Sequence, residues 1–436
     1  MKLAFLTPGT GNYYCGVCMR DNSLAKQLIA LGHDVTMLPT YLPHFLDEDN
    51  ASPDQPIFFG GINVYLQHKF SLFRHTPKWI DRAFDSKWLL RKAAARSGMT
   101  SSKDLGEITL STFRGEDGPL VKEVNKVLNW FKEQGSPDIL FLSTIMLAGI
   151  GKVLKRELKI PVYGFLQGED SFLDSLLPEY RSEAWKLLSK DVDQLNGCIA
   201  PSKYFGDLMA DRLSLSTEKV KFHPNGITSE GIKPNDSLSK NPILGYLARL
   251  CPLKGLDILV DSFIELKNTG RHDNLQLKIA GGMTTEDEMF VEEQEKKLIR
   301  AGLSNYFSIS PNISREEKLS FLKNLTVFSV PARYSEAFGL YVVEAMLAGA
   351  PVVLPNAGAF PEIIQSTGGG KLYNSSLDGA LTKALDELIS DPENAKLIGM
   401  QAHREVQKKY SNEVLAKKLI EEVVSQLPMN PKQKAK

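Results

Sequence analysis

The sequence predicts an α/β protein built from two domains, each with a parallel sheet. Short apolar segments alternate with amphipathic helical segments, which is the order of strands and crossover helices in parallel sheets. The 436 residues fit two domains of roughly 200 residues each. Residues 228–242 are rich in Ser, Asn, Asp, Lys and Pro, which is typical of a linker. We therefore expect domains over residues 1–230 and 231–410, followed by a C-terminal helix and basic tail over 411–436.

The first domain is expected to hold strands with continuous apolar runs, because a parallel sheet is buried on both faces. The segments that fit are residues 3–7, 35–39, 139–142, 162–165, 199–201 and 220–224. The expected helices include residues 22–31, 147–158 and 171–177. The second domain repeats the alternation over residues 243–390, and a final helical stretch follows over 394–426.

Residues 41–120 interrupt this alternation and form an irregular, basic insertion in the first domain. Apolar side chains in its middle are interleaved with charges; they are Trp79, Phe84, Trp88, Leu89 and Leu90. The cations between residues 69 and 103 are Lys69, Arg74, Lys78, Arg82, Lys87, Arg91, Lys92, Arg96 and Lys103, opposed by Asp81 and Asp85. Three interpretations remain open: a helix packed on its own domain by its aromatic face, a surface that gathers the acceptor, or contact with an anionic membrane.

Composition argues against several classes of protein. Lys plus Arg number 52 and Asp plus Glu also number 52, so no net charge attracts the chain to nucleic acid. Four cysteines in a chain of this length indicate a reducing compartment. The apolar start is too short for a signal peptide, and residues 139–150 are too short to span a bilayer. We expect a cytoplasmic protein whose basic insertion could contact the inner face of a membrane.

The loop after the first strand contains Cys15 and Cys18 in a Cys-x-x-Cys arrangement. This spacing could form a redox pair or half of a zinc site. A zinc site needs two more ligands, however, and Cys198 and Cys251 are isolated in the sequence. No metal site is therefore expected.

Glu336 and Glu344 lie in the most informative segment of the chain, PARYSEAFGLYVVEAMLAGAPVV. Glu336 precedes a glycine-containing turn, and Glu344 lies within the helix that follows it. The N-terminus of a helix offers unpaired N–H groups and the positive end of a dipole, so it attracts anions. One carboxylate on either side of such an anion site can hold a sugar and a ribose around a phosphate. The segment therefore indicates an enzyme that uses a nucleotide sugar.

Arg249 and Lys254 lie about ninety residues upstream, between an apolar strand and a helix over 256–266. Arginine offers a fork for phosphate oxygens, and lysine offers a compact point charge. An isolated Arg–Lys pair is more often a solvated loop. Here the pair, the strand-to-glycine turn over 275–283 and the two glutamates follow one another in the order of a single α/β domain.

With these motifs, nearly the whole chain resembles the retaining glycosyltransferases of family 4. The resemblance rests on Gly16, Leu24-Ala25, Gly32-His33-Asp34-Val35, Pro201-Ser202, Asn225-Gly226, Arg249, Lys254, Glu336-Ala-Phe-Gly-Leu-x3-Glu344-Ala-Met and Gly349-Ala-Pro-Val-Val. It implies the GT-B fold, in which two Rossmann-like domains face a cleft and a C-terminal helix returns to the first domain. It also implies transfer of a sugar from a nucleotide sugar, with UDP as the expected nucleotide, to a hydroxyl group of a glycan, a lipid or a small molecule.

The resemblance and the motifs assign expected roles to individual residues. The expected catalytic residues are Arg249, Lys254 and Glu336. The expected donor-binding residues are Gly16, Ile313, Phe338, Gly339, Leu340 and Glu344. The candidates for contact with the acceptor or the transferred sugar are Asn12, Tyr13, Arg20, Asp21, Gln167, Glu169 and Asp170. Glu336 is expected to bind hydroxyls of the sugar, and Glu344 is expected to bind the ribose. The nucleobase is expected to contact the loop over 310–313.

Gln167 departs from the pattern, because many members of the family carry a histidine at the corresponding position. An amide can donate and accept hydrogen bonds there, but it cannot act as an acid or a base near neutral pH. Glu169 and Asp170 follow at the same strand end, where open sheets place ligands. They either bind acceptor hydroxyls or cap the helix expected over 171–177.

No metal or other cofactor is expected. No Asp-x-Asp stands beside the diphosphate-binding residues. Arg249, Lys254 and the helix N-terminus over 338–340 can stabilise the departing diphosphate instead. The acceptor hydroxyl would attack from the face that the diphosphate leaves, which retains the anomeric configuration. A double displacement would require a carboxylate beneath the anomeric carbon, for which the sequence offers no clear candidate.

Two other classes of protein remain open. The first is another GT-B enzyme, such as a nucleotide-sugar epimerase or a glycan phosphorylase. A phosphorylase requires a lysine that binds pyridoxal phosphate, and no segment resembles that site. The second is a nucleotide-sugar binder that has lost its activity, which the presence of Arg249, Lys254, Glu336 and Glu344 disfavours.

Overall fold

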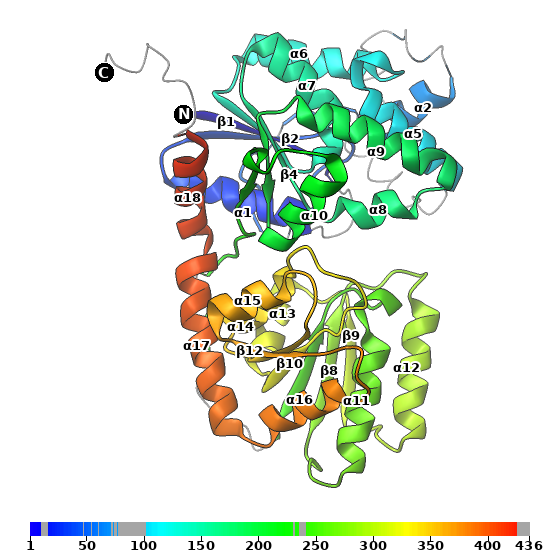
Figure 1. The fold of residues 1–436 in the computed structure, drawn as a ribbon, viewed down its shortest axis with the longest axis vertical. Coiled ribbons are helices and arrows are strands. Elements are labelled where there is room, and N and C mark those ends of the chain that lie inside the picture. The colour runs from blue at the N-terminus through cyan, green and yellow to red at the C-terminus, as the bar shows by residue number, and fades with distance from the viewer. Residues whose placement is uncertain are drawn as a thin grey trace. The chain divides into compact units, whose positions relative to one another are not determined.

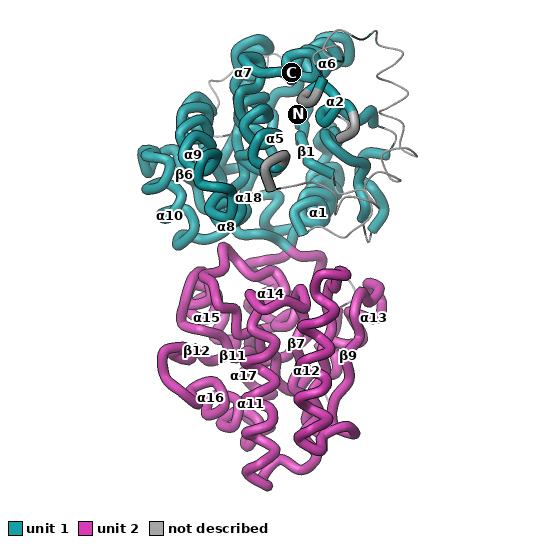
Figure 2. The backbone as a smooth tube through the Cα atoms, turned by 90° about the vertical axis from the view of Figure 1, so that its right-hand side faces the viewer, with its two compact units in different colours: residues 1–226, 412–436 teal, residues 227–411 magenta. Residues whose placement is uncertain are grey.

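The computed structural model describes residues 1–9, 16–46, 48–53, 55–59, 61–70, 73, 76, 102–229, 232–234 and 241–424. The chain divides into two compact units, shown in Figure 2. Unit 1 comprises residues 1–226 and 412–436, and unit 2 comprises residues 227–411. Each unit contains one parallel sheet of six strands, so the predicted two-sheet α/β architecture is confirmed.

The sheet of unit 1 has the strand order β2-β1-β3-β4-β5-β6, with every neighbouring pair parallel. Its strands are β1 (Lys2–Thr7), β2 (Asp34–Pro39), β3 (Ile139–Leu142), β4 (Val162–Phe165), β5 (Gly197–Ala200) and β6 (Val220–Phe222). In the register, Leu3 pairs with Val35 on one side and with Ile139 on the other. The chain order reverses between β1 and β3, which is where open sheets of this type place their ligands.

Helices cover both faces of this sheet (Figure 1). They are α1 (Gly16–Ala30), α2 (Gly61–Lys69), α5 (Ser102–Arg114), α6 (Val121–Gln134), α7 (Ala148–Leu158), α8 (Glu169–Ser175), α9 (Pro178–Asp193), α10 (Lys203–Leu213) and α18 (Asn412–Val424). The 3-10 turns are η3 (Gly115–Asp117), η4 (Ile145–Leu147) and η5 (Thr217–Lys219). α1 packs against α18, and the side chains of Leu28 and Leu419 join Phe5 and Phe141 of the sheet in one buried cluster.

Two helices of unit 1 begin earlier than the sequence predicted. α1 begins at Gly16 instead of residue 22, so Cys18, Arg20 and Asp21 lie in its first turns. α8 begins at Glu169 instead of residue 171, and Gly168 is its N-cap with φ of 97°. A glycine adopts this left-handed conformation without steric cost, which lets the helix start directly after the turn.

The sheet of unit 2 has the strand order β12-β11-β10-β7-β8-β9, again with parallel neighbours. Its strands are β7 (Ile243–Leu247), β8 (Gln276–Gly281), β9 (Phe307–Pro311), β10 (Val327–Ser329), β11 (Val352–Pro355) and β12 (Gly370–Tyr373). The chain order reverses between β7 and β10. The loops that follow these two strands therefore flank the position where a doubly wound sheet binds its ligand.

The helices of unit 2 also cover both faces of its sheet (Figure 1). They are the short 3-10 turn η6 (Pro252–Lys254), α11 (Leu256–Asn268), α12 (Glu288–Arg300), α13 (Arg315–Lys323), α14 (Leu340–Leu347), α15 (Phe360–Thr367), α16 (Ala380–Ile389) and α17 (Pro392–Tyr410). α11 packs against α12 and α16, while α14 packs against α13 and α17. The core holds fully buried Phe263, Phe328 and Val343. α13 starts with a capping box between Ser314 and Glu317, which satisfies N–H groups at its first turn.

The chain passes between the units at 226–227 and again at 411–412. The first passage lies just before the predicted linker, because Ile227 is buried in the core of unit 2 and forms a β-bridge with Ser411. The helical stretch predicted over 394–426 is divided into α17 and α18. Ser411 adopts an extended conformation, with φ of −68° and ψ of 142°, and separates the two helices.

Several predicted features lie outside the described residues. These are Asn12, Tyr13, Cys15 and residues 77–101, the centre of the basic insertion. Among the helices that the structure does describe, none has an apolar stretch long enough to cross a membrane.

Candidate active site

The candidate site lies at the carboxyl ends of the central strands of unit 2. Arg249 and Lys254 follow β7, Thr284 follows β8, Asn312 follows β9 and Glu336 follows β10. Because all strands are parallel, these loops emerge from the same edge of the sheet. The two loops with the predicted catalytic residues follow β7 and β10, the strands between which the chain order reverses.

Lys254 and Glu336 form an ion pair in which the lysine Nζ donates to Oε1 of the carboxylate. Two tyrosine hydroxyls donate to the same oxygen, Tyr341 at 2.6 Å and Tyr334 at 3.1 Å. Lys254 Nζ also donates to the hydroxyl of Tyr334. The lysine and glutamate side chains are 17% and 9% exposed, so their attraction is only weakly screened by water. The structure thus brings together two residues that are 82 positions apart in the sequence.

The loops that carry this pair are locked to each other. Arg333 forms two hydrogen bonds with the carboxylate of Asp257, at 2.7 and 2.5 Å, and also donates to the carbonyl oxygen of Pro252. Gly255 has φ of 71°, and a Cβ there would overlap the carbonyl oxygen of Pro331. The backbone of Glu336 is held from a third loop, since Ala359 N donates to its carbonyl oxygen at 2.9 Å. These contacts fix the position of the pair before any ligand binds.

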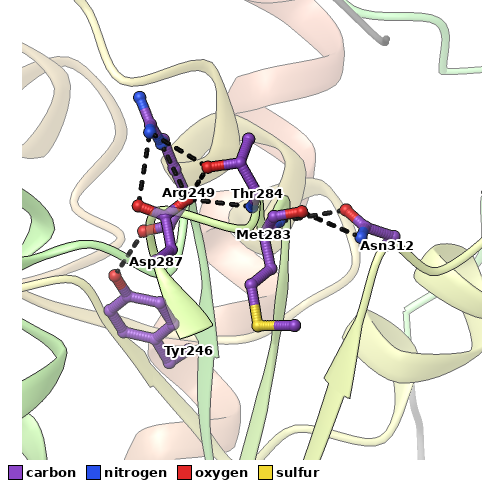
Figure 3. A network of polar contacts seen from close by, with 6 residues as sticks. All are labelled: Tyr246, Arg249, Met283, Thr284, Asp287 and Asn312. Carbon is purple, nitrogen blue, oxygen red and sulfur yellow. Dashed lines mark hydrogen bonds and ion pairs between the residues drawn. The ribbon is translucent and has the colours of Figure 1, made fainter. Parts of the chain in front are cut away.

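Arg249 does not pair with Glu336; its partners are Asp287 and Thr284, which Figure 3 shows. Its Nε and Nη2 lie 3.2 Å from the two carboxylate oxygens of Asp287, and Nη2 lies 3.5 Å from the hydroxyl of Thr284. Asp287 also accepts from the backbone N and the hydroxyl of Thr284, at 2.9 and 2.8 Å. Burial disfavours ionisation of Asp287, but the hydrogen bonds from Thr284 and Arg249 outweigh it and lower its pKa. Arg249 remains 52% exposed and available to an anion.

The loop after β9 supports this network from the side (Figure 3). Asn312 accepts from Met283 N and donates to Met283 O, both at 3.0 Å. Its backbone has φ of 54°, and its N–H donates to Gly281 O at 2.8 Å. The predicted donor-binding residue Ile313 follows and packs on the core of unit 2. The Asn312 side chain is therefore used to tie two loops together.

The predicted anion site at α14 has a glycine at its N-cap. Gly339 has φ of 89°, and no side chain caps the helix that begins at Leu340. Phe338 is buried in the core of unit 2 and anchors the turn. Glu344, one turn into the helix, accepts from Lys318 Nζ at 2.9 Å and is 24% exposed. The N–H groups of the first helical turn thus lie between Glu336, which precedes the turn, and Glu344, which lies in the helix.

In unit 1, Arg20 and Asp21 form a buried ion pair. The Arg20 guanidinium lies 4.0 Å from the centre of the Phe165 ring, and its Nη1 lies 3.4 Å from the side-chain oxygen of Asn225. Burial raises the pKa of Asp21, while the charge of Arg20 opposes that shift. Both side chains are almost inaccessible to solvent in this structure. Gly16 lies at the exposed start of α1, where a Cβ would meet nothing within 4 Å.

The residues after β4 differ in how many hydrogen bonds their side chains make to the protein. Glu169 is buried and accepts from Thr144 Oγ1 at 2.6 Å and from Gln167 N at 2.7 Å. Burial raises the pKa of Glu169, against these hydrogen bonds. Asp170 is partly buried, and its burial raises its pKa as well. The Nε2 atom of Gln167 is buried and has no hydrogen-bond partner among the residues that the structure describes. The Gln167 side chain therefore has N–H groups with which it could bind a ligand.

Sequence reasoning missed several residues of the site. They are Thr284, Asp287, Lys318, Arg333, Tyr334 and Tyr341. Tyr334 and Tyr341 stand two residues before and five residues after Glu336, a spacing that could have suggested contact with it. Asp287 and Lys318 gave no such signal, because their partners, Arg249 and Glu344, lie on other elements of the fold. The described part of the chain contains no group of three His, Cys, Asp or Glu side chains that could hold a metal ion.

Residues 229–405, nearly all of unit 2, match the family described as Glycosyl transferases group 1. The lipopolysaccharide core biosynthesis mannosyltransferase LpcC of Rhizobium leguminosarum bv. viciae is 30% identical over 195 residues, which cover 44% of this chain and 53% of the relative. The chain thus spans about half the length of that relative. A GDP-mannose-dependent phosphatidylinositol monomannoside mannosyltransferase of Mycolicibacterium smegmatis is 24% identical over 80% of this chain and 90% of its own length.

Solved structures share the fold over the whole chain. Sucrose-phosphate synthase from Thermosynechococcus elongatus has a TM-score of 0.71 at 17% identity, covering 98% of this chain and 99% of that one. Anabaena HepE, solved in complex with UDP-glucose, has a TM-score of 0.64 at 17% identity, covering 98% of this chain and 100% of that one. The chain therefore has the GT-B fold. At such identities the likeness concerns the fold alone.

Proposed function

We propose that this protein is a retaining, metal-independent glycosyltransferase that moves a sugar from a nucleotide sugar to a hydroxyl group of a glycan, a lipid or a small molecule. The observation that carries the proposal is the Lys254–Glu336 pair, set where the chain order of the unit 2 sheet reverses. A cation and a carboxylate in contact suit the two sides of a sugar–phosphate bond. The cation faces the leaving diphosphate, and the carboxylate accepts hydrogen bonds from the sugar.

The diphosphate is bound by positive groups of the chain itself. Lys254 carries three N–H groups, of which two are used by Glu336 and Tyr334. Arg249 keeps Nη1 unpaired in the described part of the chain, because Asp287 and Thr284 take its other donors. The N–H groups at the start of α14 add the positive end of the helix dipole. Such preorganised donors stabilise the charge that develops as the diphosphate leaves.

In the proposed step, the bond between the anomeric carbon and the diphosphate oxygen breaks as the acceptor oxygen bonds to the same carbon. The acceptor attacks on the face that the diphosphate leaves, so the anomeric configuration is retained. The proton of the acceptor hydroxyl passes to the departing diphosphate oxygen. Glu336 binds hydroxyls of the sugar, Glu344 accepts from the ribose, and backbone groups of 310–313 contact the base.

The nucleotide of the donor is the finer part of the proposal. UDP is the nucleotide expected from the family resemblance, and HepE, a protein of the same fold, was solved with UDP-glucose. The name of the relative from Mycolicibacterium smegmatis specifies GDP-mannose instead. We propose UDP as the first donor to test and GDP-mannose as its direct competitor. The acceptor is bound by unit 1, with Gln167 as a candidate contact, because its Nε2 has no hydrogen-bond partner among the described residues. Gly16, at the exposed start of α1, remains a candidate contact of the donor.

Turnover in the presence of EDTA tests the proposal. Release of UDP from UDP-sugars and of GDP from GDP-mannose is measured for the wild type, for Glu336→Gln and for Glu387→Gln. Glu387 lies on α16 in an exposed pair with Lys371 and serves as the matched control. We expect metal-free turnover that falls about a hundredfold in Glu336→Gln and stays unchanged in the control. NMR of the first product should show the anomer of the donor. Turnover that requires a divalent cation, or an inverted product, would refute the respective part of the proposal.

A further inference from the structure

Among the residues that the structure describes, hydrogen-bond donors reach only one oxygen of the Glu336 carboxylate. Its Oε1 accepts from Lys254, from Tyr341 at 2.6 Å and from Tyr334 at 3.1 Å. Its Oε2 receives no donor from the residues that the structure describes. A carboxylate oxygen can accept about two hydrogen bonds, so Oε1 is saturated and Oε2 is free. The carboxylate therefore has a fixed orientation and one open oxygen.

The ammonium group of Lys254 is constrained in the same way. It lies 4.8 Å from the centre of the Tyr334 ring and 5.2 Å from that of Tyr341. Cations over aromatic faces at this range are attracted to the ring electrons. Two of its three N–H groups point to Glu336 and to the Tyr334 hydroxyl. One N–H remains without an acceptor in the described part of the chain.

We propose that Tyr334 and Tyr341 are positioning residues that saturate one side of the Lys254–Glu336 pair, so that the pair presents one acceptor to the sugar and one donor to the diphosphate. This inference rests on the proposed function. It assigns a role to two residues to which the proposed function gives none. Neither tyrosine touches the substrate in the proposal. Each acts through Glu336, and the consequence is selectivity, because a carboxylate with a single open oxygen binds hydroxyls in only one orientation.

Tyr341 remains a hydrogen-bond donor at working pH. Burial, the neighbouring Glu336 charge and the hydrogen bond to Glu336 raise the pKa of Tyr341 well above its usual value. Its hydroxyl thus stays protonated at neutral pH. The Tyr341 ring also packs near Phe328, with 6.3 Å between ring centres, so Tyr341→Phe preserves the packing and removes only the hydroxyl.

Calorimetry separates this positioning role from a purely structural one. The probes are UDP with UDP-glucose and GDP with GDP-mannose, and the pair that binds the wild type more tightly is used for all variants. The measured quantity is the Kd of the nucleoside diphosphate divided by the Kd of the corresponding nucleotide sugar. The variants are Tyr341→Phe, Tyr334→Phe and, as control, Tyr410→Phe. Tyr410 is buried in the same unit, and its hydroxyl lies 2.6 Å from Ser366 Oγ, so the control also loses one hydrogen bond of a phenol.

We expect Tyr341→Phe to lower this ratio about tenfold, because the Kd of the nucleotide sugar rises. The ratio should fall less in Tyr334→Phe and should not change in Tyr410→Phe. The affinity for the nucleoside diphosphate alone should change far less, because Lys254 keeps its pairing with Glu336. An unchanged ratio in both site variants, or an equal loss for the diphosphate and its sugar, would overturn the inference. A wild type that binds none of the four probes would instead refute the proposed function. Thermal unfolding of each variant checks that it is folded, and Tyr334→Phe carries the test if Tyr341→Phe is not.

Discussion

At the scale of single residues, the site is defined by which cation meets which carboxylate. Lys254 meets Glu336, whereas Arg249 meets Asp287. Arg249, Lys254 and Glu336 could be predicted from the sequence, because each belongs to a motif that follows a strand. Asp287 could not, since that residue reaches Arg249 only when the turn after β8 folds back on the loop after β7. The pairing of a surface arginine depends on loop geometry, which no local pattern encodes.

Removal of the Asp287 carboxylate should therefore weaken anion binding without unfolding unit 2. Asp287→Ala frees the guanidinium of Arg249 from its two contacts at 3.2 Å, so the side chain must be ordered again when the diphosphate binds. We expect the Kd for the nucleoside diphosphate to rise about fivefold to tenfold by calorimetry. Asp386→Ala is the matched control, because Asp386 pairs with Arg271 at 2.9 Å on another element. Tighter binding in Asp287→Ala would show that Asp287 competes with the ligand for Arg249.

At the scale of elements, the strands could be predicted more closely than the turns. β3 and β4 occupy the residues expected for them, because a strand buried on both faces is a continuous apolar run bounded by polar residues. The predicted start of α1 was six residues too late. Arg20 and Asp21 are charged and were assigned to a loop, but in the fold Arg20 contacts Phe165 and Asn225, which are distant in the sequence. The position of η6 against the loop after β10 was likewise not predictable, because it depends on Arg333 and on the close approach at Gly255.

Gly255 gives a direct test of that element. Gly255 and Gly270 have nearly the same φ, 71° and 68°, but a Cβ at Gly255 would overlap the Pro331 carbonyl while one at Gly270 would meet nothing within 4 Å. Gly270→Ala should cost about 1 kcal/mol from its backbone conformation alone. Gly255→Ala should cost at least about 3 kcal/mol and abolish nucleotide binding, because η6 carries Lys254. Chemical denaturation and calorimetry measure both. Equal stability of the two variants would mean that the approach to Pro331 is not needed.

At the scale of the whole molecule, each of the two units has its own sheet and core, and the C-terminal segment completes unit 1. α18 packs on α1 and buries Leu419 and Val423 in the cluster that includes Phe5. The return of the C-terminal helix to the first domain was expected from the family resemblance. The break between α17 and α18 at Ser411 was not, because the sequence there offers neither glycine nor proline to mark it.

Docking of α18 should depend on pH through His223. This side chain is 4% exposed, and burial lowers its pKa even though Glu422 of α18, at 3.9 Å, opposes the shift; the charges of Lys418 and Arg20 add to it. The unfolded chain therefore binds a proton near pH 6.5 that the folded chain does not, so stability is lost as pH falls through that value. Between about pH 7.5 and about pH 5.5, the midpoint of thermal unfolding should fall more for the wild type than for His223→Gln. Parallel pH profiles would assign the acid sensitivity to other groups.

The central claim is that Lys254 binds the diphosphate of a nucleotide sugar without a metal. Titration calorimetry of UDP, GDP and ADP and their sugars, with EDTA present, tests it on the wild type, on Lys254→Ala and on Lys371→Ala as control. Lys371 forms an exposed pair with Glu387 on another element. We predict that one nucleotide binds the wild type and the control equally and binds Lys254→Ala at least about tenfold more weakly. If no nucleotide binds the wild type, or if Lys254→Ala binds as tightly as the wild type, the claim is contradicted.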